Sequence, residues 1–142
     1  MRYYLDTSIW LDLFEDRNET GFSKSVTVQK MMTYIVSDEN RIVISPIIID
    51  ELVHNGHSKE DIARFFHPFK KLLYVQHCYR EILVQASSIA HQKGIPKNDV
   101  LHALLSRNSD AILITRDGHF SKLVDITVPV TPEELLQSKM SF

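Results

Sequence analysis

The chain has 142 residues, of which 44% are hydrophobic and 24% are charged. This length and composition suit one folded domain, so we expect a single domain over residues 1–142. The formal net charge of −2 argues against a protein that coats nucleic acid through a broad basic surface, because such domains are usually strongly basic. An enzyme that holds cations in an acidic pocket remains compatible with this charge.

The sequence also indicates a cytoplasmic protein. Cys78 is the only cysteine, so an intrachain disulfide cannot form and a reducing compartment suits the chain. No apolar stretch approaches the roughly 20 residues that a membrane span needs. The first residues lack the pattern of a signal peptide and are expected to enter a strand directly.

Short apolar stretches alternate with amphipathic ones along the chain, and this alternation predicts an α/β fold. Strands are expected at residues 2–5, 41–45, 72–75 and 111–115, with a weaker fifth strand at 126–128. Helices are expected at residues 9–14, 22–36, 47–54, 58–66, 79–92, 97–107 and after 131. The resulting architecture is a three-layer sandwich, in which helices cover both faces of a parallel sheet of about five strands.

Four acidic residues lie where the predicted strands end. Asp6 follows the first strand, Glu51 lies in the helix after the second, Asp99 opens a helix and Asp117 follows the fourth strand. Ligands of open α/β sheets bind outside the carboxyl ends of the strands, so all four can reach one site. Carboxylates gathered there would repel one another unless a cation shared the site. Oxygen ligands without thiolates suit Mg²⁺ or Mn²⁺, and such a site supports hydrolysis of a phosphodiester.

Each acidic residue also has a simpler interpretation. Asp6 and Asp99 are good N-caps for the helices that follow them. Glu51 alone is most often a solvated helix residue, and Asp117 before Gly118 is first of all a turn residue. Only the shared placement at strand ends favours a common site over four separate structural roles.

Four stretches of the sequence carry a family resemblance when they are taken together. They are YLDTSIW at residues 4–10, ISPIIIDEL at 44–52 with Gly56 after it, Asp99 at its helix start, and LITRDGHF at 113–120. In this order and spacing the chain resembles the PIN-domain family, and in size it is similar to the small prokaryotic VapC-type toxin ribonucleases. The resemblance covers essentially the whole chain.

The resemblance implies a sheet ordered 3-2-1-4-5, with the first strand central, and RNA cleavage that depends on Mg²⁺ or Mn²⁺. It also implies frequent homodimers and, for the toxins, an antitoxin protein as partner. The positions that match the acidic quartet of the family are Asp6, Glu51, Asp99 and Asp117. Ser8 and Thr115 match hydroxyl positions beside the quartet, where they would bind a carboxylate or a water, although capping and strand ending explain them equally well.

The leading hypothesis is therefore a metal-dependent endoribonuclease, which fits the toxin of a toxin-antitoxin pair. The alternative is a non-catalytic protein of the same fold that contacts RNA or a protein partner, and the acidic charge argues for it. One departure from the family pattern is His102. It interrupts the Ala-rich segment that follows the position of Asp99 in many of the toxins. It could steady Asp99 or a phosphate, but a packed or exposed histidine is the expected interpretation.

The other residues that could bind a ligand have simpler structural interpretations, which we favour. Trp10 and Tyr3 could stack on bases but are expected in the core. His54 and His57 are a poor zinc pair, because Asn55 and Gly56 break the helix between them. Three basic residues near the predicted site could contact phosphates but are usually just solvated, namely Lys97, Arg116 and Lys122.

Overall fold

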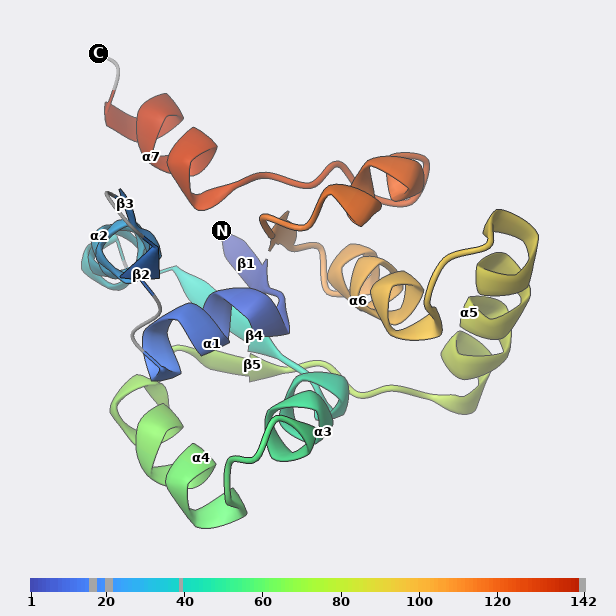
Figure 1. Ribbon diagram of the computed structural model, residues 1–142, viewed down its shortest axis with the longest axis horizontal. Helices are drawn as coiled ribbons and strands as arrows, with labels where there is room; N and C mark the ends of the chain where they lie inside the picture. Colours follow the sequence, from blue (N-terminus) through green and yellow to red (C-terminus); the bar gives the residue numbers. More distant parts are fainter. Residues whose placement is uncertain (16–17, 20–21, 39, 141–142) are drawn as a thin grey trace.

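Four parallel strands form the central sheet of the computed structural model, which describes residues 1–15, 18–19, 22–38 and 40–140. Across the sheet the order is β5 (Leu73–Val75), β4 (Arg41–Ile44), β1 (Arg2–Leu5) and β6 (Ile112–Ile114). β1 pairs with β4 on one side and with β6 on the other, so the first strand is central (Figure 1). The predicted order 3-2-1-4 is confirmed.

The predicted fifth strand at residues 126–128 is wrong in position. This stretch begins in a turn, where its first two residues donate their backbone N–H groups to the carbonyl of Leu123. The sheet continues beyond β6 only as a bridge at Val130, whose N–H donates to the carbonyl of Leu113 at 2.9 Å.

Both faces of the sheet are covered, as the continuous apolar strands predict. Tyr3, Tyr4 and Leu5 are all fully buried, although neighbouring side chains of a strand point to opposite faces. The Tyr3 hydroxyl lies near Tyr34 of one flanking helix, whereas the Tyr4 hydroxyl contacts His102 of a helix on the other face. The three-layer arrangement is therefore confirmed.

Seven α-helices lie in the described part of the chain, and most match the predicted ranges within about two residues. They are α1 (Thr7–Phe14), α2 (Lys24–Ser37), α3 (Pro46–His54), α4 (Lys59–Phe66), α5 (Arg80–Lys93), α6 (Lys97–Asn108) and α7 (Pro132–Met140). In Figure 1, α2 and α4 lie to the left of the strands, and α5 and α6 to the right. None of these helices combines the length and the apolar composition required to cross a membrane.

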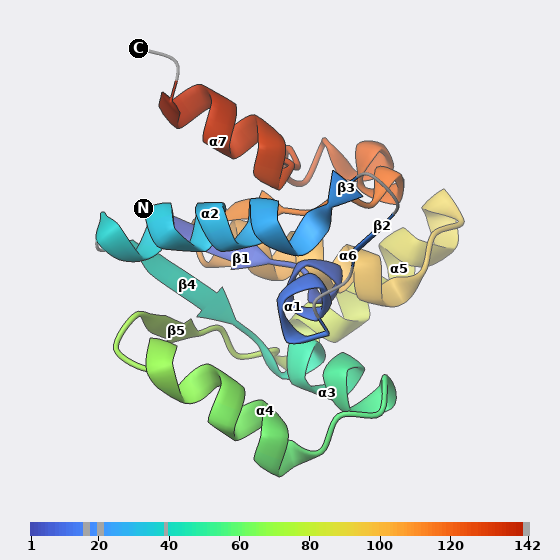
Figure 2. The ribbon, with the colours of Figure 1, turned by 60° about the vertical axis from the view of Figure 1, so that its left-hand side comes forward.

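Four shorter elements, two 3₁₀ turns and two short strands, lie between the larger ones in the described residues. Two 3₁₀ turns are η1 (His67–Phe69) and η2 (Gly118–Leu123). The short strands β2 (Asn18–Glu19) and β3 (Phe22–Ser23) pair with each other, so the helix predicted from residue 22 begins two residues later. α7 packs against α2, and Figure 2 shows the two helices side by side.

The core confirms the structural interpretation of the large aromatic residues near the N-terminus. Trp10 is fully buried and packs edge to face against Phe66, with a distance of 4.7 Å between ring centroids. Phe65 and Phe69 complete this aromatic cluster around Trp10. Neither Trp10 nor Tyr3 is accessible for stacking on a base. Their burial instead anchors β1 and α1, the two elements that flank Asp6.

Candidate metal centre

The candidate site begins where the central strand β1 ends. Leu5 is in register with Ile114 of β6, so the two parallel strands finish side by side and Asp6 lies beside Thr115. Asp6 is the N-cap of α1, and its side chain is only 4% exposed. Burial of a carboxylate is costly unless hydrogen bonds or a cation compensate it, so its partners define the site.

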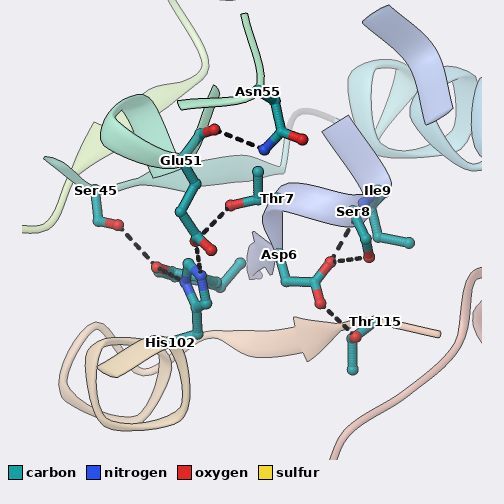
Figure 3. A network of polar contacts seen from close by, with 10 residues as sticks. Asp6, Thr7, Ser8, Ile9, Ser45, Glu51, Asn55, His102 and Thr115 are labelled. Atoms are coloured by element: carbon teal, nitrogen blue, oxygen red, sulfur yellow. Dashed lines mark hydrogen bonds and ion pairs between the residues drawn. The ribbon is translucent and has the colours of Figure 1, made fainter. Parts of the chain in front are cut away.

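Asp6 accepts three hydrogen bonds within the protein. Oδ1 accepts from the Ser8 hydroxyl at 2.6 Å and from the Ile9 backbone N–H at 3.2 Å. Oδ2 accepts from the Thr115 hydroxyl (Figure 3). The predicted contacts of Ser8 and Thr115 with a carboxylate are therefore present, and Asp6 caps α1 while its carboxylate also binds Thr115 after β6. Burial still raises the pKa of Asp6, and the hydrogen bonds from Ser8 and Thr115 offset this only in part.

Thr115 also connects Asp6 to the next acidic residue. Its Oγ1 accepts a hydrogen bond of 3.0 Å from the backbone N–H of Asp117, which caps the 3₁₀ turn η2. The predicted turn role of Asp117 is thus correct, since Asp117 Oδ1 accepts from the backbone N–H of His119 at 2.9 Å. One threonine hydroxyl therefore fixes Asp117 relative to Asp6.

Glu51 lies on α3, directly after β4, and its carboxylate turns toward the end of β1. Its Oε1 accepts from the Thr7 hydroxyl at 2.8 Å and also from His102 Nε2 (Figure 3). Burial by itself would raise the pKa of Glu51, but the hydrogen bonds from His102 and Thr7 outweigh it and lower the pKa. Glu51 is thus held in its ionised form, which is the form that binds a cation.

His102 is the residue whose surroundings the sequence described least well. It is packed, as expected, with only 3% of its side chain exposed. Its polar partners are Glu51 and Tyr4, however, and not Asp99. Local spacing pointed to Asp99 because that residue lies one helical turn away, whereas the partners of His102 come from distant parts of the chain.

Asp99 and Asp117 come together with a residue that the sequence analysis did not select. His119 Nδ1 lies 3.4 Å from Asp117 Oδ1 and 3.8 Å from Asp99 Oδ2. Burial raises the pKa of Asp99, and the nearby charges of Asp117 and Asp6 raise it further. Three of the four predicted carboxylates are therefore close enough to interact electrostatically. The sequence could have indicated His119, because it lies only two residues after Asp117 in the LITRDGHF stretch.

The donor atoms suit a divalent cation. One ligand atom from each of Asp99, Asp117 and His119 lies within 4.8 Å of the other two. Ligands about 2.1 Å from an octahedral ion are about 3.0 Å apart when adjacent and about 4.2 Å apart when opposite. The measured separations are near these values, so small side-chain adjustments would bring all three donors onto one ion. Asp6 is near enough for its charge to act on Asp99, whereas the contacts of Glu51 are with Thr7 and His102.

Other candidates from the sequence have different partners. Arg116 donates to Asp12 on α1 and to Glu133 on α7, the latter at 2.7 Å, and thereby joins these helices rather than pointing freely toward a substrate. His57 Nε2 lies 2.7 Å from Glu15 Oε2, and its ring packs on Phe14. These contacts account for His57 without zinc.

The comparisons with known proteins agree with this geometry. The PIN domain family model matches residues 3–126, a stretch that contains all four predicted acidic residues. The chain belongs to the PIN domain family. No curated protein matches the chain.

Solved structures of toxin-antitoxin proteins have the same fold. VapBC2 from Rickettsia felis, bound to a DNA fragment from its promoter, is 22% identical with a TM-score of 0.67, covering 92% of this chain and 98% of that chain. VapBC-1 from nontypeable Haemophilus influenzae is 22% identical with a TM-score of 0.64, covering 94% and 99%. A toxin-antitoxin complex from Klebsiella pneumoniae is 17% identical with a TM-score of 0.65, covering 92% and 97%.

Replacing Asp6 with Asn should stabilise the metal-free protein at neutral pH. The pKa of Asp6 is raised by burial, so its contribution to stability is fully present below the unfolded pKa of about 3.9 and is lost as the pH rises through the folded pKa. Asparagine does not ionise and avoids this loss. Urea unfolding with a chelator should show that Asp6→Asn gains stability over the wild type at pH 7 and that the gain shrinks toward pH 4.5.

Asp125→Asn is the control for this measurement. Asp125 is exposed, and its hydrogen bond with Lys93 lowers its pKa, so the substitution should give no gain at pH 7. A gain for Asp6→Asn that is equal at the two pH values, or a loss at pH 7, would contradict the role of burial.

Proposed function

We propose that this protein is an endoribonuclease that hydrolyses phosphodiester bonds of RNA with the help of Mg²⁺ or Mn²⁺. The observation that supports it most directly is the convergence of distant carboxylates at one end of the sheet, in a chain of the PIN domain family. The RNA preference rests on the family resemblance. Two further expectations, the single domain over residues 1–142 and the cytoplasmic location, stay predictions.

The roles of the residues follow from their positions. In this proposal the metal ligands are Asp6, Glu51, Asp99 and Asp117, which are also the catalytic acids. These carboxylates would hold a divalent cation, which would supply Lewis-acid chemistry: a polarised phosphoryl group, a more acidic water and charge stabilisation at the leaving oxygen. Ser8 and Thr115 orient the Asp6 carboxylate through their hydroxyl groups, so that its remaining lone pairs face the site.

The path of the substrate is suggested by a pocket next to Glu51. This pocket has a volume of about 370 Å³ and is lined by Asp50, Glu51, His54, Asn55 and Asn98. Amide side chains offer both donors and acceptors, which is the chemistry that reads the edge of an unstacked base. We place a nucleotide next to the scissile phosphate in this pocket, which fits a single-stranded segment better than a continuous duplex.

A protein partner belongs to the same proposal. The similar structures are those of toxin-antitoxin proteins and complexes, so we propose that this chain is the toxin of such a pair and is inhibited by an antitoxin protein. An adjacent gene for a small DNA-binding protein that blocks cleavage would support this role. The homodimer implied by the family resemblance stays a prediction.

Removing any one of the four carboxylates should abolish cleavage. Asp6→Asn, Glu51→Gln, Asp99→Asn and Asp117→Asn each delete a negative ligand while keeping the size of the side chain. We expect RNA cleavage in Mn²⁺ to fall to background in all four variants and to stay at the wild-type rate in Asp125→Asn, which changes an exposed acid outside the site. Wild-type cleavage by the four variants would refute the proposal.

Metal binding separates the nuclease from the non-catalytic alternative. A ligand that binds only the folded state stabilises it by about 2.7 kcal/mol when its free concentration is roughly 100 times its Kd. Mn²⁺ should therefore raise the unfolding temperature of the wild type but not of Asp99→Asn. A wild type that gains no stability and cuts no RNA would instead be a binding or scaffold protein.

His119 should decide between Mg²⁺ and Mn²⁺. Both ions favour oxygen ligands, but the smaller and harder Mg²⁺ keeps an all-oxygen shell more strictly than Mn²⁺, which accepts one imidazole nitrogen more readily. If His119 Nδ1 joins Asp99 and Asp117 as a ligand, His119→Ala should weaken Mn²⁺ binding by about 10-fold and leave Mg²⁺ binding nearly unchanged, as titration calorimetry can measure. His119 is 63% exposed, so the fold should tolerate the change. An equal effect on both ions would argue against nitrogen ligation.

A further inference from the structure

A chain of buried polar contacts runs from β4 to the candidate metal centre. Ser45 Oγ lies 2.8 Å from the Tyr4 hydroxyl, which lies 2.7 Å from His102 Nδ1. The other ring nitrogen, His102 Nε2, contacts Glu51 Oε1 (Figure 3). Ser45 and Tyr4 are fully buried and His102 is 3% exposed, so water does not substitute for these contacts.

The direction of the last hydrogen bond in this series, between His102 Nε2 and Glu51 Oε1, is fixed. An ionised carboxylate can only accept, so His102 Nε2 carries the proton that Glu51 receives. The Tyr4 hydroxyl then forms hydrogen bonds with both His102 Nδ1 and the Ser45 hydroxyl, so each of these polar groups has a partner. Burial raises the pKa of Tyr4, which keeps its hydroxyl protonated. Because each of these buried groups has a partner, the imidazole ring is held in one orientation.

Glu51 has the longest side chain of the four acidic residues, so its carboxylate needs a support to stay in one place. Its side chain is 29% exposed and lies on the rim of the pocket of about 370 Å³, into which a long, flexible carboxylate could turn. His102 and Thr7 both bind Oε1, and Asn98 lines the same pocket as Glu51. A carboxylate offers about four lone-pair positions, so these donors fix the group and still leave room for a cation.

We propose that His102 is a positioning residue, held by Tyr4 and Ser45, that fixes the Glu51 carboxylate for the cation. This inference rests on the proposed function, because it assumes that Glu51 is a metal ligand. It also gives α6 a double role, since Asp99 at its start would be a ligand and His102 one turn later would orient a ligand from α3. Outer groups of this kind typically change metal affinity by 10- to 100-fold when they are removed.

Three variants test the role of the Nε2 donor by Mn²⁺ titration of the metal-free protein. His102→Leu removes the donor and should weaken Mn²⁺ binding by about 10- to 100-fold. His102→Gln can keep an N–H near the Nε2 position and should bind within a few-fold of the wild type. His67→Leu is the control and should have no effect, because His67 is exposed and lies before β5, at the opposite end of the strands.

A double-mutant cycle separates positioning from a general effect on structure. If His102 acts through Glu51, His102→Leu should cost no further Mn²⁺ affinity once Glu51→Gln is present. Additive losses, or a His102→Leu protein that unfolds more easily but binds Mn²⁺ within two-fold of the wild type, would overturn the inference. If His102→Leu does not fold, Tyr4→Phe decides: a several-fold weaker binding is expected, and unchanged binding refutes it.

The failure of this inference can be told apart from failure of the proposed function. If Asp99→Asn binds Mn²⁺ as tightly as the wild type, the proposed metal centre itself is wrong. If Asp99→Asn loses Mn²⁺ but His102→Leu does not, the metal centre stands and only the positioning role of His102 is refuted.

Discussion

The structure depends on how one buried carboxylate is accommodated at the end of the central strand. Asp6 is almost inaccessible, and charge in such a place is tolerated only when hydrogen bonds or a cation compensate it. Two hydroxyls and one backbone N–H supply part of this compensation. Burial still raises the pKa of Asp6, so ionisation of this carboxyl in the folded protein keeps a residual cost. This residual cost is the physical reason to expect a positive charge at the site.

The groups around Asp6 form two networks that approach it from opposite sides. On one side, Thr115 links Asp6 to Asp117, so β6 and the turn after it are held to the end of β1. On the other side, Glu51 is tied to Thr7 and His102, which join α3 to α1 and α6. Each network is anchored in the buried core, which limits how far the carboxylates can separate when they repel one another.

The same helices that cover the sheet also place the chemistry. α6 carries its apolar residues into the core and presents Asp99 and His102 toward the strand ends. Arg116 joins α1 to α7, because its guanidinium forms ion pairs with Asp12 and Glu133.

The sequence by itself determined the features that depend on local pattern. Apolar stretches predicted the strands and their burial on both faces, and capping residues such as Ser58 and Gly94 predicted individual helix ends. The acidic residues were identified because parallel strands must end at one edge, as Asp6 and Asp117 do. The pairing of β2 with β3 and the misplaced fifth strand could not be predicted from local pattern, since pairing depends on which strand lies alongside.

Only the tertiary structure decided which polar groups meet. His102 pairs with Glu51, 51 residues earlier in the chain, and Arg116 pairs with Asp12, 104 residues earlier. The proximity of His119 to Asp99 likewise required α6 and η2 to be packed together. Side-chain hydrogen bonds act over about 3 Å in space and carry no periodicity in sequence. Their partners follow from how the helices pack on the sheet.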